Sequence, residues 1–486
     1  MRPTTSPTAL TTIAAGFKFT EVNPQVAVTG ITHNSREVLP GDIYVALAGA
    51  NHHGIEFVNQ AIENGAVAIA TDSDGLKQLP SGISEIELVN PRVDMATLAA
   101  RVYQYPQKKL TIVGVTGTNG KTSVTHILQS LFTNFGYKVG VIGTVGTYID
   151  AKHIPGARTT PESTDLYSIL AQMVETGVTH VFMEVSSHAL ELHRVNGLEF
   201  GNVIFTNLSQ DHLDFHGTME NYFAAKAKLF TKEFAKSGVI CVEDSWGQKL
   251  ADQVLIPVTT VGPNADWQVE NLRLSVSKTT FSLRHNNVSM QCELPMIGAF
   301  NATNAAIAIA VSAKLGLDPQ LVTRDLVNVH PVPGRSQIVT HNSQGTAIVD
   351  YAHTPEAVEK VLTTLREVCD GQLITVLGCG GDRDALKRPL MGKIAAEISD
   401  VVIVTDDNPR SEDPASIRAQ VKAGIVETGV KVFEIGDRRE AINKALTLAS
   451  NNDVVAVLGK GHEQGQEIAG QVHPFDDVKV IQAEAK

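Results

Sequence analysis

The strongest pattern in the chain is the alternation of short apolar runs with amphipathic helical stretches. The apolar run Leu110–Thr116 leads into a glycine-rich turn, and the helical pattern Lys121–Phe132 follows it. A buried strand, a short turn and a helix form the first unit of a parallel α/β sheet. Further apolar runs predict buried strands at Lys138–Gly143, His180–Val185 and Gly201–Thr206. The middle of the chain is therefore predicted to be a parallel sheet covered by helices.

The same alternation is most regular toward the C-terminus. Five apolar runs are separated by helical stretches, and they are Ala347–Val349, Leu373–Gly378, Asp400–Val404, Lys431–Ile435 and Asp453–Leu458. At least three of these runs end in short loops rich in Gly, Asp, Arg and His. In an open parallel sheet such loops face the crevice in which ligands bind. A second binding surface is therefore expected there.

The N-terminal segment has a weaker pattern, and its limits come from turn residues. Short strands are predicted at Asp42–Gly49 and Ala66–Thr71, around a helix at Gly54–Gly65. The polar, proline-containing segment Gln104–Lys109 predicts a linker, and turn residues cluster again around Pro331–Arg335. A chain of 486 residues is too long for one hydrophobic core. We predict three domains, spanning residues 1–106, 107–335 and 336–486.

Charge and composition narrow the function classes. The chain has 40 Lys+Arg against 52 Asp+Glu, a formal net charge of -12, which argues against nucleic acid or an anionic membrane as a partner. No run of 18 apolar residues predicts a membrane span, and Met1–Phe17 lacks the pattern of a secretory signal. The cysteines lack CxxC spacing and predict neither a zinc site nor a disulfide framework. A cytoplasmic protein is expected.

The glycine-rich turn carries the most specific chemistry. It reads GVTGTNGKT from Gly114 to Thr122, between a predicted strand and a predicted helix. Glycines let successive backbone N–H groups point at a phosphate chain. Lys121 can neutralise the terminal phosphates, and the Thr122 hydroxyl can join a Mg²⁺ shell. The spacing departs from GxxxxGK[ST], because position 115 is Val. The strand before and the helix after favour a nucleotide site over an accidental turn.

Three motifs in this order resemble the Mur ligases: GTNGKT at 117–122, MEVSSH at 183–188 and NLSQDHLDFH at 207–216. The resemblance covers essentially the whole chain. It implies a three-domain α/β architecture, in which a central P-loop ATPase-type parallel sheet is flanked by an N-terminal uridine-binding α/β domain and a C-terminal Rossmann-like domain. ATP and Mg²⁺ are the implied cofactors. The implied ATP contacts are Gly117, Thr118, Asn119, Gly120, Lys121, Thr122, Ser123, Asn301, Arg335 and Asp350.

The resemblance also implies the catalytic residues, which are Lys121, Glu184, His212 and Lys226. Thr122, Glu184 and His212 match magnesium ligands of the family. Lys226 matches a lysine that the family carries as a carbamate formed from CO₂, and this carbamylated lysine would help to hold a second Mg²⁺. Without the resemblance, Lys226 would be interpreted as a solvated surface lysine and His212 as a loop histidine.

Contacts to a UDP-linked substrate are implied as well. Asn34–Asp42 is similar to the family's DSRxVxPGD element, although Asn34 stands where the family has Asp. The implied substrate contacts are Ser35, Thr159, Thr160, Ser186 and Arg194. An arginine such as Arg194 can clamp a carboxylate or phosphate with two hydrogen bonds. Leu192 stands where some relatives have Gln, so one substrate hydrogen bond is missing or replaced.

Two C-terminal motifs bear on the incoming amino acid: GGDRD at 380–384 and DNPR at 407–410. The DNPR form resembles family members that add meso-diaminopimelate, whereas members that add L-lysine usually lack this Arg. Diaminopimelate has a second carboxylate, and a guanidinium group suits it. The implied amino-acid contacts are Arg383, Asp407, Asn408, Pro409, Arg410, Gly459 and Glu463.

Together these features imply an ATP-dependent acid–amino-acid ligase of peptidoglycan precursor synthesis, and hence a role in cell-wall growth, cell shape and division. ATP would phosphorylate the γ-carboxylate of D-Glu in UDP-MurNAc-L-Ala-D-Glu, and the amine of meso-diaminopimelate would attack the acyl phosphate. The partners would be these small molecules, and a monomer is expected. Addition of L-lysine, a related Mur or folylpolyglutamate ligase, and a nucleotide-dependent binding protein without catalysis remain alternatives.

Overall fold

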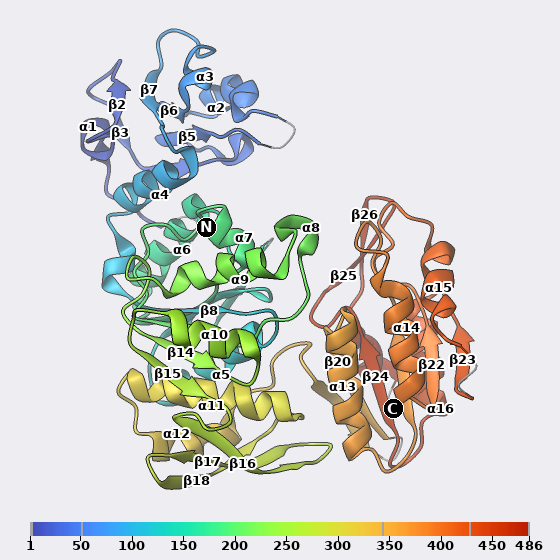
Figure 1. Cartoon of the computed structure of the whole chain (residues 1–486). Helices are drawn as coiled ribbons and strands as arrows, with labels where there is room; N and C mark the ends of the chain where they lie inside the picture. The colour runs from blue at the N-terminus through green and yellow to red at the C-terminus, as the bar shows by residue number, and fades with distance from the viewer. Residues whose placement is uncertain (1–2, 50–51, 157, 343–344, 427–428, 485–486) are drawn as a thin grey trace.

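The computed structural model describes residues 3–49, 52–156, 158–342, 345–426 and 429–484, without the side chains of 341–342. Its three large sheets follow one another along the chain, and Figure 1 shows them as blue, green-to-yellow and orange-to-red regions. The predicted α/β class with a central parallel sheet is confirmed. The orange-to-red region stands beside the central one, and the chain passes between them near Arg335.

The N-terminal sheet has five strands, of which only β2 is antiparallel to its neighbour. In spatial order they are β2 (Lys18–Thr20), β7 (Ser84–Glu87), β6 (Ala68–Thr71), β5 (Asp42–Ala46) and β4 (Gly30–Thr32). A separate pair is β1 (Thr8–Ala9) with β3 (Ala27–Val28). The helices here are α1 (Leu10–Ile13), η1 (Ser35–Glu37), η2 (Gly54–Phe57), α2 (Val58–Glu63), α3 (Ser73–Leu76), α4 (Pro91–Val102) and η3 (Pro106–Lys109).

The central sheet has eleven strands, and six of them form its parallel core. In spatial order they are β11 (Lys152–Ile154), β10 (Gly146–Ile149), β9 (Val139–Gly143), β12 (His180–Glu184), β8 (Thr111–Thr116), β13 (Asn202–Phe205), β14 (Gly238–Cys241), β15 (Val258–Val261), β16 (Trp267–Leu274), β17 (Thr279–His285) and β18 (Val288–Leu294). Antiparallel hairpins extend the sheet at both edges.

Helices cover both faces of this sheet. They are α5 (Lys121–Asn134), α6 (Ser163–Glu175), α7 (Ser187–Glu191), α8 (Leu213–His216), α9 (Met219–Ala227), η4 (Lys228–Phe230), α10 (Ser245–Gln253), α11 (Ala299–Lys314), α12 (Pro319–Asp325) and η5 (Leu326–Asn328). Val113 and Val115 of β8 pack with α5 and α11, whereas Ile112 packs in the core that contains α6 and α9. Alternate residues of the strand therefore point to opposite faces of the sheet. Full burial of each such side chain stabilises the folded state by about 1.5–3 kcal/mol.

The C-terminal sheet has six strands, of which only β19 is antiparallel to its neighbour. In spatial order they are β19 (Gln337–Asn342), β20 (Gly345–Asp350), β24 (Val454–Leu458), β21 (Leu373–Leu377), β22 (Val401–Val404) and β23 (Lys431–Glu434). A hairpin, β25 (Gly465–Ile468) with β26 (Gln471–Pro474), follows. The helices are α13 (Pro355–Val368), α14 (Lys387–Ile398), α15 (Pro414–Ala423), α16 (Arg438–Leu448) and α17 (Asp477–Glu484).

Two expectations need correction. The segment Gln104–Lys109 is not a loose linker: Tyr105 adopts a left-handed conformation, η3 follows, and the buried Gln107 side chain donates to the Gly197 carbonyl at 3.3 Å. The helix expected at Gly54–Gly65 is divided into η2, which His53 caps through the Ile55 N–H, and α2; the backbone departs from helical geometry at Phe57 (φ -104°, ψ 10°) between them. The predicted domain limits stay a prediction, and each large sheet lies inside one of them.

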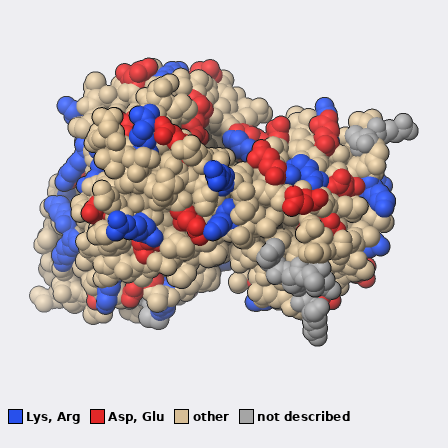
Figure 2. All heavy atoms as spheres, turned by 90° about the horizontal axis from the view of Figure 1, so that it is seen from below, with Lys and Arg blue, Asp and Glu red and all other residues tan. Residues whose placement is uncertain are grey.

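Charged side chains of both signs share one face of the molecule (Figure 2). On the face drawn in Figure 2, Lys and Arg alternate with Asp and Glu across a larger and a smaller lobe. All four cysteines, Cys241, Cys292, Cys369 and Cys379, are buried and free. Within the described ranges, no helix has both the length and the apolar character that crossing a membrane requires.

A fully buried ion pair joins the last helix to the C-terminal sheet. Arg438, at the start of α16, donates to both carboxylate oxygens of Asp477 at 2.8 and 2.7 Å, and neither side chain is exposed. The same guanidinium donates to the Leu458 carbonyl at 3.0 Å, where β24 ends. This arginine therefore fixes α17 against the strand that leads to the Gly459 loop.

We predict that Arg438→Met lowers the free energy of unfolding by about 3–5 kcal/mol, because it leaves the Asp477 carboxylate buried without a cation. Urea unfolding measures this loss. The double variant Arg438→Met/Asp477→Asn should regain part of the stability, since no charge then stays buried. A loss below about 1 kcal/mol in the single variant, the range of exposed ion pairs, would contradict this role.

Candidate active site

The glycine-rich loop between β8 and α5 is wedged against its neighbours. Gly117 has φ +146°, and a Cβ atom there would lie 1.9 Å from Thr206 Oγ1. Gly120 has φ +85°, and a Cβ atom there would lie 2.6 Å from Asn304 Oδ1. Both positions lack room for a side chain and have conformations that favour glycine. The backbone of the loop can therefore approach a phosphate chain closely.

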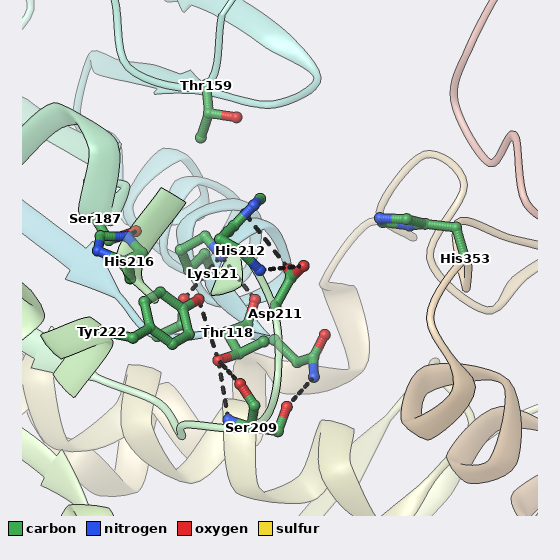
Figure 3. Close-up of polar contacts among 12 residues, drawn as sticks. Thr118, Lys121, Thr159, Ser187, Ser209, Asp211, His212, His216, Tyr222 and His353 are labelled. Atoms are coloured by element: carbon green, nitrogen blue, oxygen red, sulfur yellow. Dashed lines mark hydrogen bonds and ion pairs between the residues drawn. The ribbon is translucent and has the colours of Figure 1, made fainter. Parts of the chain in front are cut away.

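Residues after β13 hold this loop in place. The Thr118 N–H donates to the Asn207 carbonyl at 2.9 Å, and the Asn119 N–H donates to Asn207 Oδ1 at 2.9 Å. The Ser209 N–H donates to Thr118 Oγ1 at 3.0 Å, and the Tyr222 hydroxyl lies 3.4 Å from the same oxygen (Figure 3). The conformation of the loop is thus set before any ligand binds.

Two lysine side chains converge on one carbonyl of the loop. Lys121 Nζ donates to the Gly117 and Thr118 carbonyls at 2.9 and 2.8 Å, and Lys226 Nζ donates to the Gly117 carbonyl at 2.8 Å. Lys226 is only 1% exposed, so the interpretation as a solvated lysine was wrong: its face of α9 packs inward. Burial, and then repulsion from Lys121, holds the pKa of Lys226 well below its ordinary value.

A set of oxygen atoms lies beside the loop. The Glu184 carboxylate is 1% exposed at the end of β12. It accepts from Thr122 Oγ1 at 2.9 Å and from the backbone and hydroxyl of Thr144 at 2.9 and 3.0 Å. Carboxylate and hydroxyl oxygens suit a hard cation such as Mg²⁺. Among the residues that the structure describes, no group of three or more His, Cys, Asp or Glu side chains is arranged to hold a metal.

His212 lies on the loop that precedes α8. It has φ +53°, and its Nε2 is 3.4 Å from Asp211 Oδ2. Burial lowers the pKa of His212 to about 4, although the negative charge of Asp211 acts to raise it. Figure 3 shows its ring close to Lys121 and, from the C-terminal region, His353 with its ring directed toward Asp211. No hydrogen bond joins His212 to Thr122 or Glu184 in the described part of the chain, so its role as a metal ligand stays a prediction.

The remaining predicted ATP contacts lie on α5, on α11, at the joint before β19 and at the end of β20. Asn301 is buried, and its amide donates to the Ile297 carbonyl at 2.8 Å. Arg335 Nη2 donates to Thr122 Oγ1 at 3.3 Å, and its guanidinium stacks 4.5 Å from the Tyr351 ring centroid. Asp350 accepts from the Ser336 and Ala352 N–H groups, and burial raises its pKa. Ser123 is buried in the first turn of α5.

A cavity of about 390 Å³ lies between the N-terminal and central regions, and of the predicted substrate contacts only Ser35 lines it. Ser35 donates to Gln60 Oε1 at 2.7 Å. Glu162, also in its lining, pairs with Arg92, Arg158 and Arg194 at 3.0, 3.2 and 2.9 Å. Three guanidinium groups around one carboxylate leave a net positive cluster, which suits an anionic ligand.

The other residues of this set lie next to Glu184. Thr159 Oγ1 is 3.1 Å from Thr144 Oγ1. Thr160 is buried and donates to the Glu184 carbonyl at 2.9 Å, and the Ser186 N–H donates to Thr160 Oγ1 at 3.1 Å. Ser186 also caps α7. The predicted substrate residues therefore form two groups: Ser35 lines the cavity, and Thr159, Thr160 and Ser186 lie beside Thr144 and Glu184. Arg194 pairs with Glu162 of the cavity lining.

The predicted amino-acid contacts meet at the carboxyl ends of β24, β21 and β22, which are neighbours in the sheet. A Cβ atom at Gly381 would lie 2.0 Å from the Pro409 carbonyl oxygen, so the two motifs pack backbone to backbone. Arg410 Nη1 donates to the Gly381 carbonyl at 2.6 Å, and its Nε lies 3.3 Å from Glu467 Oε2. Arg383 is exposed on the same loop.

The loop that follows β24 approaches the central sheet at the joint between the central and C-terminal sheets. A Cβ atom at Gly334 would lie 2.2 Å from the His462 backbone nitrogen. Burial lowers the pKa of His462 to about 4, while a hydrogen bond with the Thr144 backbone opposes this shift. The loop that carries Gly459 and Glu463 is thus linked to the Thr144–Glu184 group.

Comparison with known proteins agrees with this arrangement. Three family models match consecutive parts of the chain: "Mur ligase family, catalytic domain" at 27–105, "Mur ligase middle domain" at 115–312 and "Mur ligase, glutamate ligase domain" at 334–461. The "UDP-N-acetylmuramoyl-L-alanyl-D-glutamate--2,6-diaminopimelate ligase" of Streptomyces coelicolor is 44% identical, over 94% of this chain and 92% of its own length. The protein of the same name from Aquifex aeolicus is 41% identical over 93% of each chain.

Solved structures give the same result. A structure of a UDP-N-acetylmuramoyl-L-alanyl-D-glutamate--2,6-diaminopimelate ligase has a TM-score of 0.70 at 33% identity and covers 99% of each chain. The MurF ligase of Thermotoga maritima, solved in complex with ADP, shares the fold with a TM-score of 0.64 at 19% identity, over 94% of this chain and 97% of its own. Fold and site define an α/β protein with three large sheets and a glycine-rich loop beside a buried carboxylate in the central one. The chain belongs to the Mur ligase family.

Sequence reasoning missed several residues that shape the site. Thr144, Glu162 and Tyr222 contact predicted site residues, but they lie in no motif with a chemical signature. Asn304, whose oxygen faces Gly120, is a further residue of this kind. A helix periodicity could place Tyr222 on the face of Lys226, but only the fold brings that face against the loop.

The loop at 380–384 is held by a second ion pair, which generates a pH prediction. Glu412 accepts from both Arg388 Nη groups at 2.8 Å and from the Asp382 N–H at 2.6 Å. The hydrogen bonds from Arg388 lower the pKa of Glu412 most, and the hydrogen bond from the Asp382 N–H lowers it further. The pKa falls from 4.5 to about 2.

We predict that Glu412→Gln destabilises the protein by an amount that depends on pH. Because the carboxylate has its lowered pKa only in the folded state, its contribution is full above pH 4.5 and is lost as the pH falls toward about 2. Urea unfolding of the variant and the wild type at several pH values measures the difference. A difference that stays constant through this window would contradict the pairing.

Proposed function

We propose that the protein is an ATP-dependent ligase that adds meso-2,6-diaminopimelate to the γ-carboxylate of D-Glu in UDP-MurNAc-L-Ala-D-Glu. The observation that carries the proposal is similarity over nearly the full length to ligases of that name. The site supports it, because one chain contains a glycine-rich loop that suits phosphates, a cavity lined by cationic groups and the loops with the predicted amino-acid contacts. Peptidoglycan precursor synthesis is the process in which such a ligase acts.

Thr122 and Glu184 are the residues that would hold Mg²⁺, and the fit rests on their oxygen donors. Bound ATP supplies the phosphoryl group that activates the substrate carboxylate. Lys121 and Arg335 place positive charge where negative charge builds up during phosphoryl transfer. No nucleophile of the protein is needed, because the incoming amine attacks the activated carboxylate.

In the amino-acid pocket, Arg410 would bind the second carboxylate of diaminopimelate, and Glu463 an ammonium group. Support comes from the position of both residues in the loops after β22 and β24, the two strands that flank β21. Since the pocket and the phosphate-binding loop belong to different sheets, we infer that catalysis includes a closing movement that excludes water from the activated substrate. We also propose that the domains span residues 1–106, 107–335 and 336–486, and that the protein is a cytoplasmic monomer.

We predict that phosphate release with ATP, Mg²⁺ and UDP-MurNAc-L-Ala-D-Glu requires meso-diaminopimelate and is much weaker with L-lysine, because only the former fills the Arg410 site. A coupled phosphate assay measures both. Release with lysine alone would overturn the amino-acid assignment. Release with neither would favour another ligase or a binding protein.

We predict that Lys121→Ala lowers kcat at least about 100-fold, because it removes a cation from the transferred phosphoryl group. Lys108→Ala changes a lysine in the η3 segment before the same strand and serves as the matched control. Full activity in Lys121→Ala would refute the nucleotide site proposed here.

We further propose that Lys226 carries a carbamate. Burial lowers the pKa of Lys226, which favours the neutral amine, the form that attacks CO₂. With ¹³C-labelled bicarbonate, NMR should detect one carbamate signal that disappears in Lys226→Ala and persists in Lys228→Ala, whose lysine is half-exposed and pairs with Glu191. A signal that survives in Lys226→Ala, or no signal in the wild type, would overturn the assignment.

A further inference from the structure

Lys460 is a fully buried lysine in the loop that follows β24. Its side chain is 0% exposed. The Nζ atom donates to Asn408 Oδ1 at 2.9 Å and to Glu463 Oε2 at 3.3 Å, and it lies 3.6 Å from Asp407 Oδ1. One cation therefore contacts three residues of the predicted amino-acid pocket, from two separate loops.

The geometry of Asn408 depends on this cation. Its oxygen accepts from Lys460 Nζ, and its nitrogen donates to Glu463 Oε2 at 2.8 Å. The same oxygen accepts from the Glu467 N–H at 3.1 Å. Because the ammonium can only donate, it fixes which end of the amide faces the Glu463 carboxylate. Both side-chain contacts of Glu463 use Oε2, and this leaves Oε1 for a ligand.

The charges lead to the same conclusion. Asp407 and Glu463 are 8% and 33% exposed, so two carboxylates stand close together with limited contact to water. Buried like charges repel strongly unless a cation lies between them. With Lys460 the group has a net charge of about -1, which suits one incoming ammonium group. Without it, the carboxylates would separate and the pocket would lose its shape.

We propose that Lys460 is a positioning residue that assembles the ammonium-binding face of the amino-acid pocket through Asp407, Asn408 and Glu463. The inference rests on the proposed ligase function. Lys460 does not touch the reacting atoms: its Nζ contacts only the residues that would bind the amino acid. Its effect is therefore on binding of the amino acid rather than on phosphoryl transfer.

The test is Lys460→Met in the complete protein, with steady-state kinetics for each substrate. The expected result is a rise of about 10- to 100-fold in the KM for meso-diaminopimelate, the cost of misplaced hydrogen bonds to a charged group. The KM for ATP should change less than about twofold. Lys422→Met is the matched control, because Lys422 is a half-exposed lysine of the same region that pairs with Glu434. An unchanged amino-acid KM in Lys460→Met would overturn the proposal.

A double-mutant cycle separates positioning from a merely structural role. In a Glu463→Gln background, Lys460→Met should raise the amino-acid KM much less than in the wild type, because the two residues act through one interaction. Equal effects in both backgrounds would overturn the proposal. If Lys460→Met does not fold, Asp407→Asn/Lys460→Met is compared with Asp407→Asn, since this double variant leaves one carboxylate fewer without its cation. An equal KM for meso-diaminopimelate in these two variants would likewise overturn the proposal.

The two proposals fail in different ways. If the wild type releases no phosphate with either amino acid, the ligase function fails and the positioning role fails with it. If the wild type is active and the Lys460 variants bind the amino acid normally, only the positioning role fails.

Discussion

The close contact of the Gly117–Gly120 loop with its neighbours is the constraint on which the rest of the site depends. Thr206 and Asn304 leave no space for a side chain at either glycine. The loop carbonyls therefore face inward, where Lys121 and Lys226 meet at the Gly117 oxygen. Positive charge on both amines would be unfavourable at this distance, and this repulsion contributes to the lowered pKa of Lys226. A bound anion would offset positive charge on either amine. The electrostatics of the loop favour a polyphosphate before one is bound.

Parallel sheets explain why the binding regions lie where they do. In the central sheet, β8 and β12 deliver the glycine loop and Glu184 to one edge. In the C-terminal sheet, three adjacent strands deliver the GGDRD, DNPR and Gly459 loops in the same way. Since the carboxyl ends of parallel strands share an edge, residues distant in sequence become neighbours. The Gly334–His462 contact then joins the two edges.

Much of this was predictable from sequence, but only where local pattern decides structure. The strand–loop–helix unit at Leu110–Phe132 and the five C-terminal strands follow from apolar runs, with ends shifted by a few residues. The hairpin β16–β18 was missed, because its exposed face interrupts the apolar pattern. The Glu162 cluster could not be predicted either, since Arg92 and Arg194 reach it from separate elements. Contacts of this kind depend on tertiary packing, which periodicity does not encode.

Three buried cations show how partners decide the state of a charge. Arg438 has Asp477, and Lys460 has Asp407 and Glu463, so each is offset by carboxylates at close range. Lys226 makes no ion pair within the described ranges, and it contacts a carbonyl and the Tyr222 ring. Burial and the repulsion from Lys121 lower its pKa more than the charge of Asp211 raises it. A buried lysine without an anion favours its neutral form. That form is a nucleophile, so the same burial that destabilises the cation prepares the amine for reaction with CO₂. Carbamylation would convert an uncompensated cation into the anion that two neighbouring positive groups, Lys121 and a bound metal, require.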